Sequence, residues 1–549
     1  MTSLYAVGLA VAVAVQTPPA ARPPDAAGRI SGVVIRRDTS RPIEDAIVRL
    51  VRWEGGFGQQ LALARTDADG RFVVEGLKPG EYGLTVSAEA FVSLDFGQER
   101  PGQTARRILL KEGQHFDGAD VALPPTTAIE GRVLDEFGDP APGITVQVMR
   151  VQFASGSRRM APVLGGPEYH PTDDLGRFRI INLPPGDYYL LALAGPFAGP
   201  HDPSGFAPTY FPGTRAATDA APVRLDLGQD VPGLTFQLVP APMSTVSGVL
   251  ADDAGKPVAA GDVRFFQTTG DDVRSFVMGR IATGPDGFFE LRNVAPGTYV
   301  IQAFGRPVGG GNLARAPFAS HALTVSAGVD VMDLRLTIRT GATLRGRIML
   351  DGDAPPPVAN RVRVFPSPIN FVSGPAMGGP PNTETRDDWT FEVQNLFGIS
   401  TIRALSGSSQ WFLKQVMRDG KVITDQPLDF RDGDIDGIEV TLTSRGPVLD
   451  GTVTDLDGPT AECSVLVFST DPARWAFPSR YFAQERPADR GRFTIRGLPP
   501  GDYLVVAVPP VVGESWQDPE FLRQHVALAT RVSLGESVTT STSLKVVRR

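Results

Sequence analysis

Short stretches in which apolar and polar residues alternate recur along the whole chain. Near the N-terminus the alternation covers 43–51, 71–75 and 82–88, after an apolar-rich extended segment at 29–35. Gly, Pro and Asp residues separate these stretches. A period of two residues between such turns is typical of antiparallel strands with one buried face. The pattern predicts an all-β protein, with 516–527 as a candidate short helix.

This strand pattern belongs to a three-part signature that recurs five times, about every hundred residues. A glycine flanked by apolar residues comes first, an acidic turn running into phenylalanine second, and a Pro-Gly turn followed by tyrosine third. The first-part glycines are Gly32, Gly131, Gly248, Gly346 and Gly451, and the turn glycines are Gly80, Gly186, Gly297 and Gly501. Each copy of such a repeat is one structural unit, and this unit is long enough for its own hydrophobic core.

The repeat divides the chain into five predicted domains behind a leader. The leader and its linker cover 1–28, and copies one to five cover 29–124, 125–241, 242–340, 341–443 and 444–549. Several short strands per copy predict a tandem array of Greek-key β-sandwiches. The fourth copy is divergent because 395–401 has lost both the proline and the tyrosine. Short linkers, two of them with proline, predict a semi-rigid rod.

Each element of the signature has an expected mechanical role. In the Pro-Gly pair, glycine is expected to supply the positive φ of a type II turn. The tyrosine that follows is expected to start an inward-facing strand and to hydrogen-bond back to the turn, as corner tyrosines do. The first-strand glycine indicates either close packing or a β-bulge.

The net charge limits the classes of partner, and the cysteine content limits the redox chemistry. The net charge of −8 argues against a nucleic-acid or anionic-membrane partner, because both need a basic face. The single cysteine, Cys463, excludes internal disulfides. It lies in an alternating run, which favours a buried core thiol over a reactive one.

The N-terminus favours export. Residues 4–15 are almost entirely apolar and precede a Pro- and Ala-rich linker. The stretch is too short to span a bilayer and fits a signal peptide with a cleavage site near 12–14, although a basic leader is missing. No other segment is long and apolar enough to predict a transmembrane span. We expect a protein of the periplasm, the outer surface or the extracellular space.

Four segments carry a resemblance to a known family. They are GRVLDEFGDPAPG at 131–143, TDDLGRFRIINLPPGDYY at 172–189, YFPGT at 210–214 and WQDPEFL at 516–522. Together they resemble bacterial proteins with carboxypeptidase regulatory-like domains, over essentially residues 29–549. The resemblance implies transthyretin-like (prealbumin-like) sandwiches, often grouped with carbohydrate-binding-like folds. It also implies an exported protein of mostly undefined function.

The sequence lacks the patterns of an enzyme. Zinc carboxypeptidases need His-x-x-Glu and a later His, yet no histidine here has Glu three residues on. A nucleophile elbow, a phosphate loop and a dinucleotide fingerprint are also missing. We therefore predict a protein without catalytic residues and without a cofactor.

Only one string resembles a metal site. Asp432, Asp434 and Asp436 match the first half of a calcium loop, but its twelfth position is Thr443 where such a loop needs Glu. We favour a structural turn and keep calcium as the alternative.

Exposed aromatic rings are the candidates for a specific ligand, because such rings stack on sugar faces. The candidate carbohydrate-binding residues are Trp53, Phe57, Tyr210, Trp475 and Tyr481, with Phe211, Phe477 and Phe482 beside them. The alternative is that these rings cover sandwich ends or seams between domains. Trp389 and Trp411 lie in strand-like contexts, which favours the core.

The sequence thus predicts an exported, non-catalytic binding or structural protein. One hypothesis is a glycan-binding array whose partner is a polysaccharide, and it requires exposed aromatics. The other is a protein scaffold or adhesin stalk whose partner is an envelope protein, and it requires an apolar patch or a free sheet edge. An accessory subunit of a hydrolase is a remote third.

Overall fold

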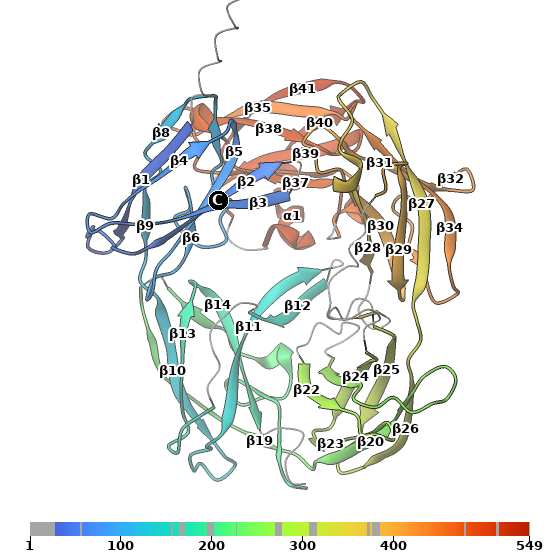
Figure 1. The fold of residues 1–549 in the computed structure, drawn as a ribbon. Helices are drawn as coiled ribbons and strands as arrows, with labels where there is room; N and C mark the ends of the chain where they lie inside the picture. Colours follow the sequence, from blue (N-terminus) through green and yellow to red (C-terminus); the bar gives the residue numbers. More distant parts are fainter. Residues whose placement is uncertain are drawn as a thin grey trace, which may run out of the picture.

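The structure is a computed structural model. It describes residues 28–54, 57–154, 157–163, 171–194, 203–226, 228–268, 277–306, 316–369, 374–375, 385–476, 479–511 and 515–547. The predicted signal segment therefore lies outside the described residues. About 55% of the structure is strand and 5% is helix, and the strands form the predicted tandem array of β-sandwiches (Figure 1).

The first sheet of each copy has the first-part glycine on an inner strand. That strand pairs antiparallel with the strand that carries the signature phenylalanine, and parallel with a late strand of the copy. In pairing order, these sheets are β4 (Arg71–Leu77), β1 (Gly28–Arg36) and β8 (His115–Asp117), with β9 (Val121–Leu123) also on β1; β13 (Arg177–Leu183), β10 (Thr127–Leu134) and β18 (Val231–Gln237); β23 (Phe288–Val294), β20 (Ser244–Ala251) and β26 (Val331–Thr337); β29 (Thr390–Leu396), β27 (Ala342–Asp351), β34 (Ile435–Thr443), β31 (Phe412–Arg418) and β32 (Lys421–Val422); and β38 (Arg492–Arg496), β35 (Val448–Thr454) and β41 (Thr539–Lys545).

The second sheet of each copy contains the strand that begins at the glycine of the Pro-Gly pair or, in copy four, directly after Gly398. In pairing order, these sheets are β3 (Phe57–Arg65), β2 (Ile47–Glu54), β5 (Gly80–Ser87) and β6 (Leu94–Asp95), with β7 (Ile108–Leu110) also on β5; β12 (Ser157–Pro162), β11 (Ile144–Ala154), β14 (Gly186–Ala194) and β16 (Thr209–Tyr210), with β17 (Val223–Leu225) also on β14; β22 (Val277–Ala282), β21 (Asp262–Gln267), β24 (Gly297–Phe304) and β25 (Phe318–Val325); β28 (Arg363–Pro368), β30 (Ile399–Leu405) and β33 (Leu428–Asp429); and β37 (Phe482–Glu485), β36 (Ser464–Ser469), β39 (Gly501–Val508) and β40 (Thr530–Leu534).

Helical structure is confined to short pieces among the described residues. The predicted helix near 516–527 is present as η6 (Ser515–Gln517), α1 (Pro519–His525) and η7 (Val526–Leu528). Asp518 caps α1 by accepting a hydrogen bond from the backbone N–H of Glu520 at 2.9 Å. The remaining 3₁₀ turns are η1 (Ala217–Asp219), η3 (Ala359–Arg361), η4 (Pro472–Arg474) and η5 (Asp489–Gly491).

The corner tyrosines are among the largest fully buried side chains. Each hydroxyl donates a hydrogen bond to a backbone carbonyl four residues earlier, which satisfies a polar group that burial takes out of water. The pairs are Tyr82 with Lys78, Tyr188 with Pro184, Tyr299 with Ala295 and Tyr503 with Pro499, at 2.5–2.7 Å. The predicted bond back to the turn is confirmed in all four copies that have the tyrosine.

The type II geometry predicted for the Pro-Gly pairs is wrong. Gly186 and Gly501 have φ of 155°, far from the value near 80° that such a turn needs, and both begin strands. Instead, the positive φ lies a few residues earlier, at Gly76, Asn293 and Gly497. Gly76 and Asn293 lie at register shifts inside β4 and β23, and Gly497 directly follows β38.

Close approach explains the first-strand glycines. A Cβ on Gly131, Gly248, Gly346 or Gly451 would come within 2.1–2.2 Å of the carbonyl oxygen of its partner on the parallel strand. No heavy atom fits at that distance. In copies two, three and four the pairing register also shifts just before the glycine. The extra residue of each shift lies on the partner strand, so close packing is the interpretation that accounts for these glycines.

The fourth copy differs in how its sheets are built. Its β31 pairs with β34 in the first sheet, whereas β25 and β40 pair with second-sheet strands in copies three and five. Ser400 stands where the other copies have the tyrosine. The indole of Trp411, 2% exposed, packs into this core, and Trp389 packs against the core while partly buried.

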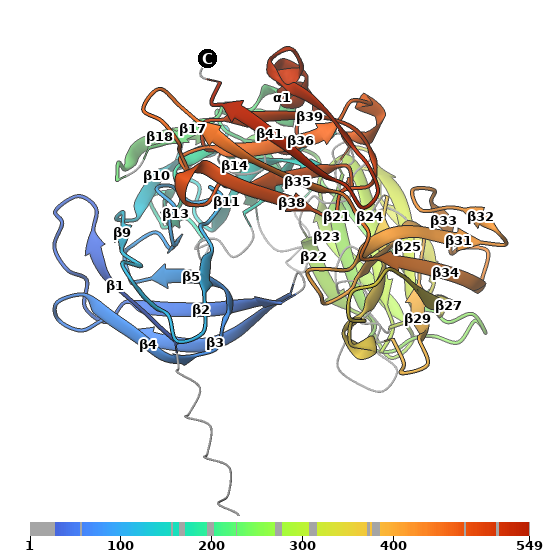
Figure 2. The same ribbon diagram turned by 90° about the horizontal axis from the view of Figure 1, so that it is seen from above.

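The five sandwiches do not form the predicted rod. Figures 1 and 2 show the chain curling so that copy five returns to copy one. Arg486 of copy five donates to the carbonyl oxygens of Gly97 and Thr104 in copy one, and Gln484 donates to the Thr104 hydroxyl at 2.9 Å. Proline in a linker stiffens a few residues, but contacts between copies set the overall path. We call this closed arrangement the ring.

Copy five also contacts two other copies. Tyr481 donates to Asp425 of copy four at 2.9 Å, and Lys414 of copy four forms an ion pair with Glu536 of copy five. In addition, η6 packs against β11 of copy two. Copy five therefore holds the ring together.

Candidate functional site

Three clefts on the described surface lie beside elements of the repeat. One, of about 620 Å³, lies on the first sheet of copy two. A second, of about 500 Å³, lies at the seam of copies three and four. The third, of about 820 Å³, lies between copies one and four. We compare the second and third, because each of them lies between two copies.

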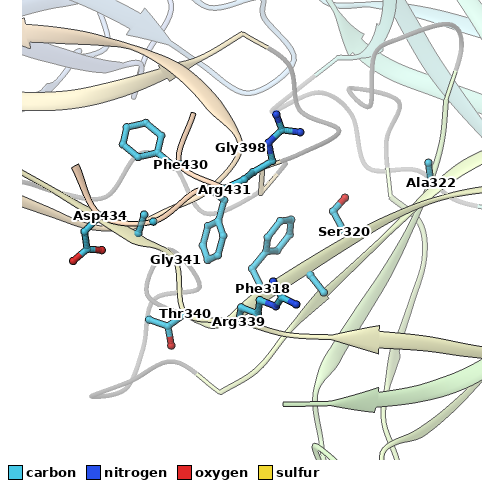
Figure 3. Close-up of a pocket in the computed structure, with 14 residues that line it drawn as sticks. Phe318, Ser320, Ala322, Arg339, Thr340, Gly341, Gly398, Phe430, Arg431 and Asp434 are labelled. Carbon is cyan, nitrogen blue, oxygen red and sulfur yellow. The ribbon is translucent and has the colours of Figure 1, made fainter. Parts of the chain in front are cut away.

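The cleft at the seam of copies three and four is lined by rings that already pack on each other (Figure 3). Phe318 is 5% exposed and Phe430 is 3% exposed. The ring of Phe397 lies 5.1 Å from that of Phe318. Arg431 at its edge forms an ion pair with Asp429. Phe318 and Phe430 are thus buried at a junction between domains, whereas Phe397 is partly buried.

The copy-one wall of the third cleft is a row across the outer face of the second sheet. Trp53 of β2 lies opposite Glu81 of β5, and Glu81 lies opposite Leu109 of β7. The side chains alternate between the two faces of a strand, so all three leave the core on the same side. Trp53 is half-buried, and Leu109 is 69% exposed. We call this cleft the copy 1–4 cleft.

A glycine makes room for the indole in this row. A Cβ on Gly83 would lie 2.9 Å from Trp53 Nε1 and 3.1 Å from Arg107 Nη1. The guanidinium of Arg107 lies 4.1 Å from the Trp53 ring centre, and its Nε lies 3.6 Å from Glu81 Oε1. This cation–π contact and ion pair set the orientation of the ring.

The copy-four wall consists of two loops. One contains Pro355–Val358 and runs into η3, and the other contains Ser408–Gln410. Trp411 ties the two together, because its Nε1 donates to the carbonyl of Pro355 at 2.8 Å. The Ser406 hydroxyl donates within the second loop, to the carbonyl of Trp411 at 2.6 Å. The wall therefore offers hydroxyl and amide groups on a fixed frame.

The charges of the copy 1–4 cleft are mainly positive. Arg52, Arg107 and Arg361 line it, against one lining carboxylate, Glu81. Glu485 of copy five lies close to Glu81 and Arg107, and burial raises its pKa to about 7, with Glu81 adding to the rise and Arg107 opposing it. Three arginines also line the cleft on copy two, Arg132, Arg177 and Arg179, so such a lining is not particular to the copy 1–4 cleft.

Two of the five predicted sugar-binding rings are buried. Trp475 is 5% exposed, its Nε1 donates to the Ser469 carbonyl at 2.7 Å, and its ring meets Phe468 edge-on. Tyr210 is 7% exposed and packs with Met149, and burial raises its pKa. Neither ring has the exposed face that sugar stacking requires, so the structure corrects both expectations.

The other predicted rings have different surroundings. Tyr481 lies between Arg474 and Arg480, at 4.3 and 5.2 Å, and its hydroxyl is bonded across the seam to copy four. Phe482 stacks on Trp516 at 4.4 Å. The side chain of Phe57, and all of Phe477, lie outside the described residues. Of the predicted rings with a described side chain, Trp53 lines the copy 1–4 cleft.

The acidic string of copy four acts as a structural turn. Asp434 accepts a hydrogen bond from the backbone N–H of Thr343 at 2.8 Å, which together with Arg345 lowers its pKa. Asp436 also pairs with Arg345, whereas Asp432 is exposed. Asp230 and Asp330 make the same bond to the first strands of copies two and three.

Within the part of the chain that the structure describes, no three His, Cys, Asp or Glu side chains gather in a way that could hold a metal ion. The calcium alternative for Asp432, Asp434 and Asp436 stays a prediction, and the bonds of Asp434 and Asp436 to copy-four groups favour the structural turn. Cys463 is 1% exposed, as predicted, and burial raises the pKa of its thiol to about 12. The described helices include none long and apolar enough to cross a membrane.

Sequence reasoning missed most of the copy 1–4 cleft. Gly83 and Glu81 carried a signal, since both occupy outward positions in the alternating strand beside Trp53. The sequence carried no signal for Arg361 or for Ser408–Gln410, because only the closure of the ring brings copy four opposite copy one.

The fold defines the class of the protein as tandem transthyretin-like β-sandwiches. Residues 29–122 match the family model described as the carboxypeptidase regulatory-like domain. The predicted resemblance is therefore confirmed, and the match itself covers copy one. No curated protein matches the chain.

Several solved structures are similar to parts of this chain. The streptococcal ancillary pilin is 13% identical with a TM-score of 0.18, and the match covers 57% of this chain and 99% of the pilin. The minor pilin of Streptococcus agalactiae is 15% identical with a TM-score of 0.24, covering 39% and 98%. A shaft pilin of Lactobacillus rhamnosus GG is 11% identical with a TM-score of 0.19, again covering 39% and 98%.

Proposed function

We propose that this protein is an exported, non-catalytic binding protein that takes a glycan into the copy 1–4 cleft. The observation that carries the proposal is the half-exposed indole of Trp53 in a cleft of about 820 Å³ whose other wall carries Ser408, Ser409 and Gln410. Sugar sites combine an aromatic platform with hydrogen-bonding groups that fix orientation. Export rests on the apolar N-terminal segment.

Two features of the cleft support this proposal over a chance hollow. Gly83 leaves room for the indole, and Arg107, which directly precedes β7, holds the ring by a cation–π contact. On the other side, buried Trp411 fixes the loop that contains Pro355. Both walls are thus preorganised, and preorganisation lowers the entropic cost of binding.

The test is affinity electrophoresis of the mature chain through gels containing single polysaccharides, neutral and acidic. We expect retardation by at least one glycan, and we expect Trp53→Ala to weaken it about tenfold, because the stacking surface is lost. Phe137→Ala is the matched control, since Phe137 is an aromatic residue of copy two that is 81% exposed. Absence of retardation on every glycan, or equal loss in both variants, would contradict the proposal.

A second candidate function is a protein scaffold, and one observation favours it. Strand β3 is an edge strand of its sheet, and it exposes Leu61 and Leu63 by 43% and 59%. Exposed apolar edges accept strands from partner proteins. Replacing both leucines with Lys is expected to abolish capture of such a partner while leaving glycan retardation unchanged.

A further inference from the structure

We propose that the edge of strand β25, at the seam of copies three and four, captures an extended, uncharged segment of another polypeptide, which adds to the sheet as a further strand. This site is separate from the copy 1–4 cleft and does not depend on glycan binding. Three features carry it: the direction of the backbone groups of β25, the composition of this strand and the cleft beside it.

The backbone of β25 has a free side. Phe318 exchanges two backbone hydrogen bonds with Arg339, at 2.9 and 3.1 Å, on the side away from β24. Alternate residues of an antiparallel strand turn their N–H and C=O groups to the same side. Ala322 and Thr324 therefore also turn these groups away from β24. Among the described residues, no backbone or side-chain group pairs with them on that side.

Strand β25 lacks the features that usually protect a sheet edge. Natural edge strands are very short, or carry charged side chains or proline. The eight residues of β25, FASHALTV, include no Asp, Glu, Lys, Arg or Pro. Every other described second-sheet edge strand longer than three residues contains Arg or Glu: Arg65 of β3, Arg159 of β12, Arg280 of β22, Arg363 of β28, Glu485 of β37 and Arg531 of β40.

The open edge forms one wall of the cleft at the seam of copies three and four (Figure 3). Phe318, Ser320 and Ala322 line it from β25, and Phe397 and Gly398 line it from copy four. The partly buried ring of Phe397 lies 5.1 Å from that of Phe318, which gives an added strand an apolar surface. The volume of about 500 Å³ lies within the roughly 300–1,000 Å³ usual for ligand sites. It accommodates a short extended chain but no second domain.

The charged side chains that line this cleft do not select a charged occupant. All three are exposed, and Arg431 is already paired with Asp429. Asp434 forms an ion pair with Arg345 at 3.1 Å. Arg339 lies at the end of β25 where its own backbone already closes the edge. Along the open part of the edge, main-chain pairing supplies the affinity, and apolar or hydroxyl side chains fit the uncharged wall.

The probe is a blocked heptapeptide of alternating threonine and valine, titrated by calorimetry into the full chain. We expect this peptide to bind. The same peptide with every backbone nitrogen methylated donates no main-chain hydrogen bond, and we expect it to bind at least about tenfold more weakly. This comparison uses the unaltered chain, so it stays decisive even if a variant fails to fold.

Ala322→Pro tests the edge itself. Proline at this position removes an outward N–H and no hydrogen bond to β24, so an edge strand tolerates it. We expect about tenfold weaker binding of the unmethylated peptide with unchanged thermal unfolding. Arg531→Pro is the matched control on edge strand β40. Its backbone also faces outward, because the Ser533 carbonyl two residues on accepts from the Thr540 hydroxyl at 3.3 Å on the side away from β39.

Failure of the unmethylated peptide to bind would overturn the inference and leave the proposed glycan binding standing, since that site is tested separately. Equal binding of the two peptides would also overturn it, because contact with the rings alone would then account for the affinity. Equal losses in Ala322→Pro and Arg531→Pro would have the same consequence. Dimerisation at high concentration that Ala322→Pro abolishes would assign the edge to a second copy of this chain, and would likewise overturn the inference.

Discussion

Arg486 of copy five donates a hydrogen bond to the backbone carbonyl of Thr104 in copy one at 3.2 Å, although 382 positions separate them. The side chain of Arg486 is 5% exposed and is also held by both carboxylate oxygens of Glu462 at 2.8 Å. A buried guanidinium persists only where its donors are satisfied. The contact therefore joins the two ends of the array.

Removing this guanidinium is expected to open the ring. Arg486→Ala loses charged hydrogen bonds to copy one, and we expect the seam of copies one and five to weaken by about 3 kcal/mol. Small-angle X-ray scattering should then report a larger radius of gyration. Arg496→Ala, at an exposed position on β38, is the control. An unchanged radius in Arg486→Ala would show that the ring does not depend on this contact.

The seam is expected to weaken as the pH rises. Burial, with help from Glu81 and against Arg107, raises the pKa of Glu485 from 4.5 to about 7 in the closed ring. The closed ring then binds a proton that the open form releases. The stabilisation of the closed ring by protonated Glu485 is complete below about pH 4.5 and is lost as the pH rises through about 7.

Glu485→Gln should remove this pH dependence, because glutamine stays neutral. Scattering curves recorded from pH 4.5 to pH 8 on the variant and on the unaltered chain would measure it. Glu112→Gln changes an exposed glutamate of copy one and serves as the control. If both variants keep the transition of the unaltered chain, another group controls the seam.

Each corner tyrosine is expected to stabilise its own copy. Tyr299→Phe removes the hydroxyl that donates to the Ala295 carbonyl at 2.7 Å and leaves a buried acceptor unpaired. The expected cost is about 1–2 kcal/mol. Hydrogen exchange of β23 and β24 would detect it as faster exchange in copy three. Phe288→Ala, at a ring that is 44% exposed on β23, should have a smaller effect.

The first-strand glycines are expected to tolerate no side chain. In Gly346→Ala the new Cβ would meet the Ile438 carbonyl oxygen at 2.1 Å, which forces β27 and β34 apart. We expect a loss of about 3 kcal/mol in copy four. Gly446→Ala is a matched control in the same chain, because its Cβ would meet only Phe412, at 3.9 Å. Similar thermal unfolding of both variants would refute the steric explanation.

The sequence carried enough information for the sandwiches but not for their arrangement. The alternation around Tyr82 and Tyr299, and the spacing of the glycines, predicted strands, repeats and buried corners, because these depend on contacts within one copy. The path of the chain depends on Arg486 meeting Gly97 and Thr104. No periodic pattern encodes that contact.

The limits of local sequence also explain which residues of the candidate site could be predicted. Trp53 stays a prediction as a sugar-binding residue, and the structure places it in the copy 1–4 cleft beside the outward-facing Gly83. Trp475 and Tyr210 were wrong as exposed rings, because local sequence did not reveal that Phe468 and Met149 cover them. Arg361 and Gln410 became part of the cleft through the meeting of copies one and four.

The two walls of the copy 1–4 cleft come from domains that are not neighbours in the sequence. In an open array of repeats, a duplication or deletion changes only the length. Here the gain or loss of one copy would move one wall away from the other and abolish the cleft. The number of copies is therefore a condition for the existence of the cleft itself.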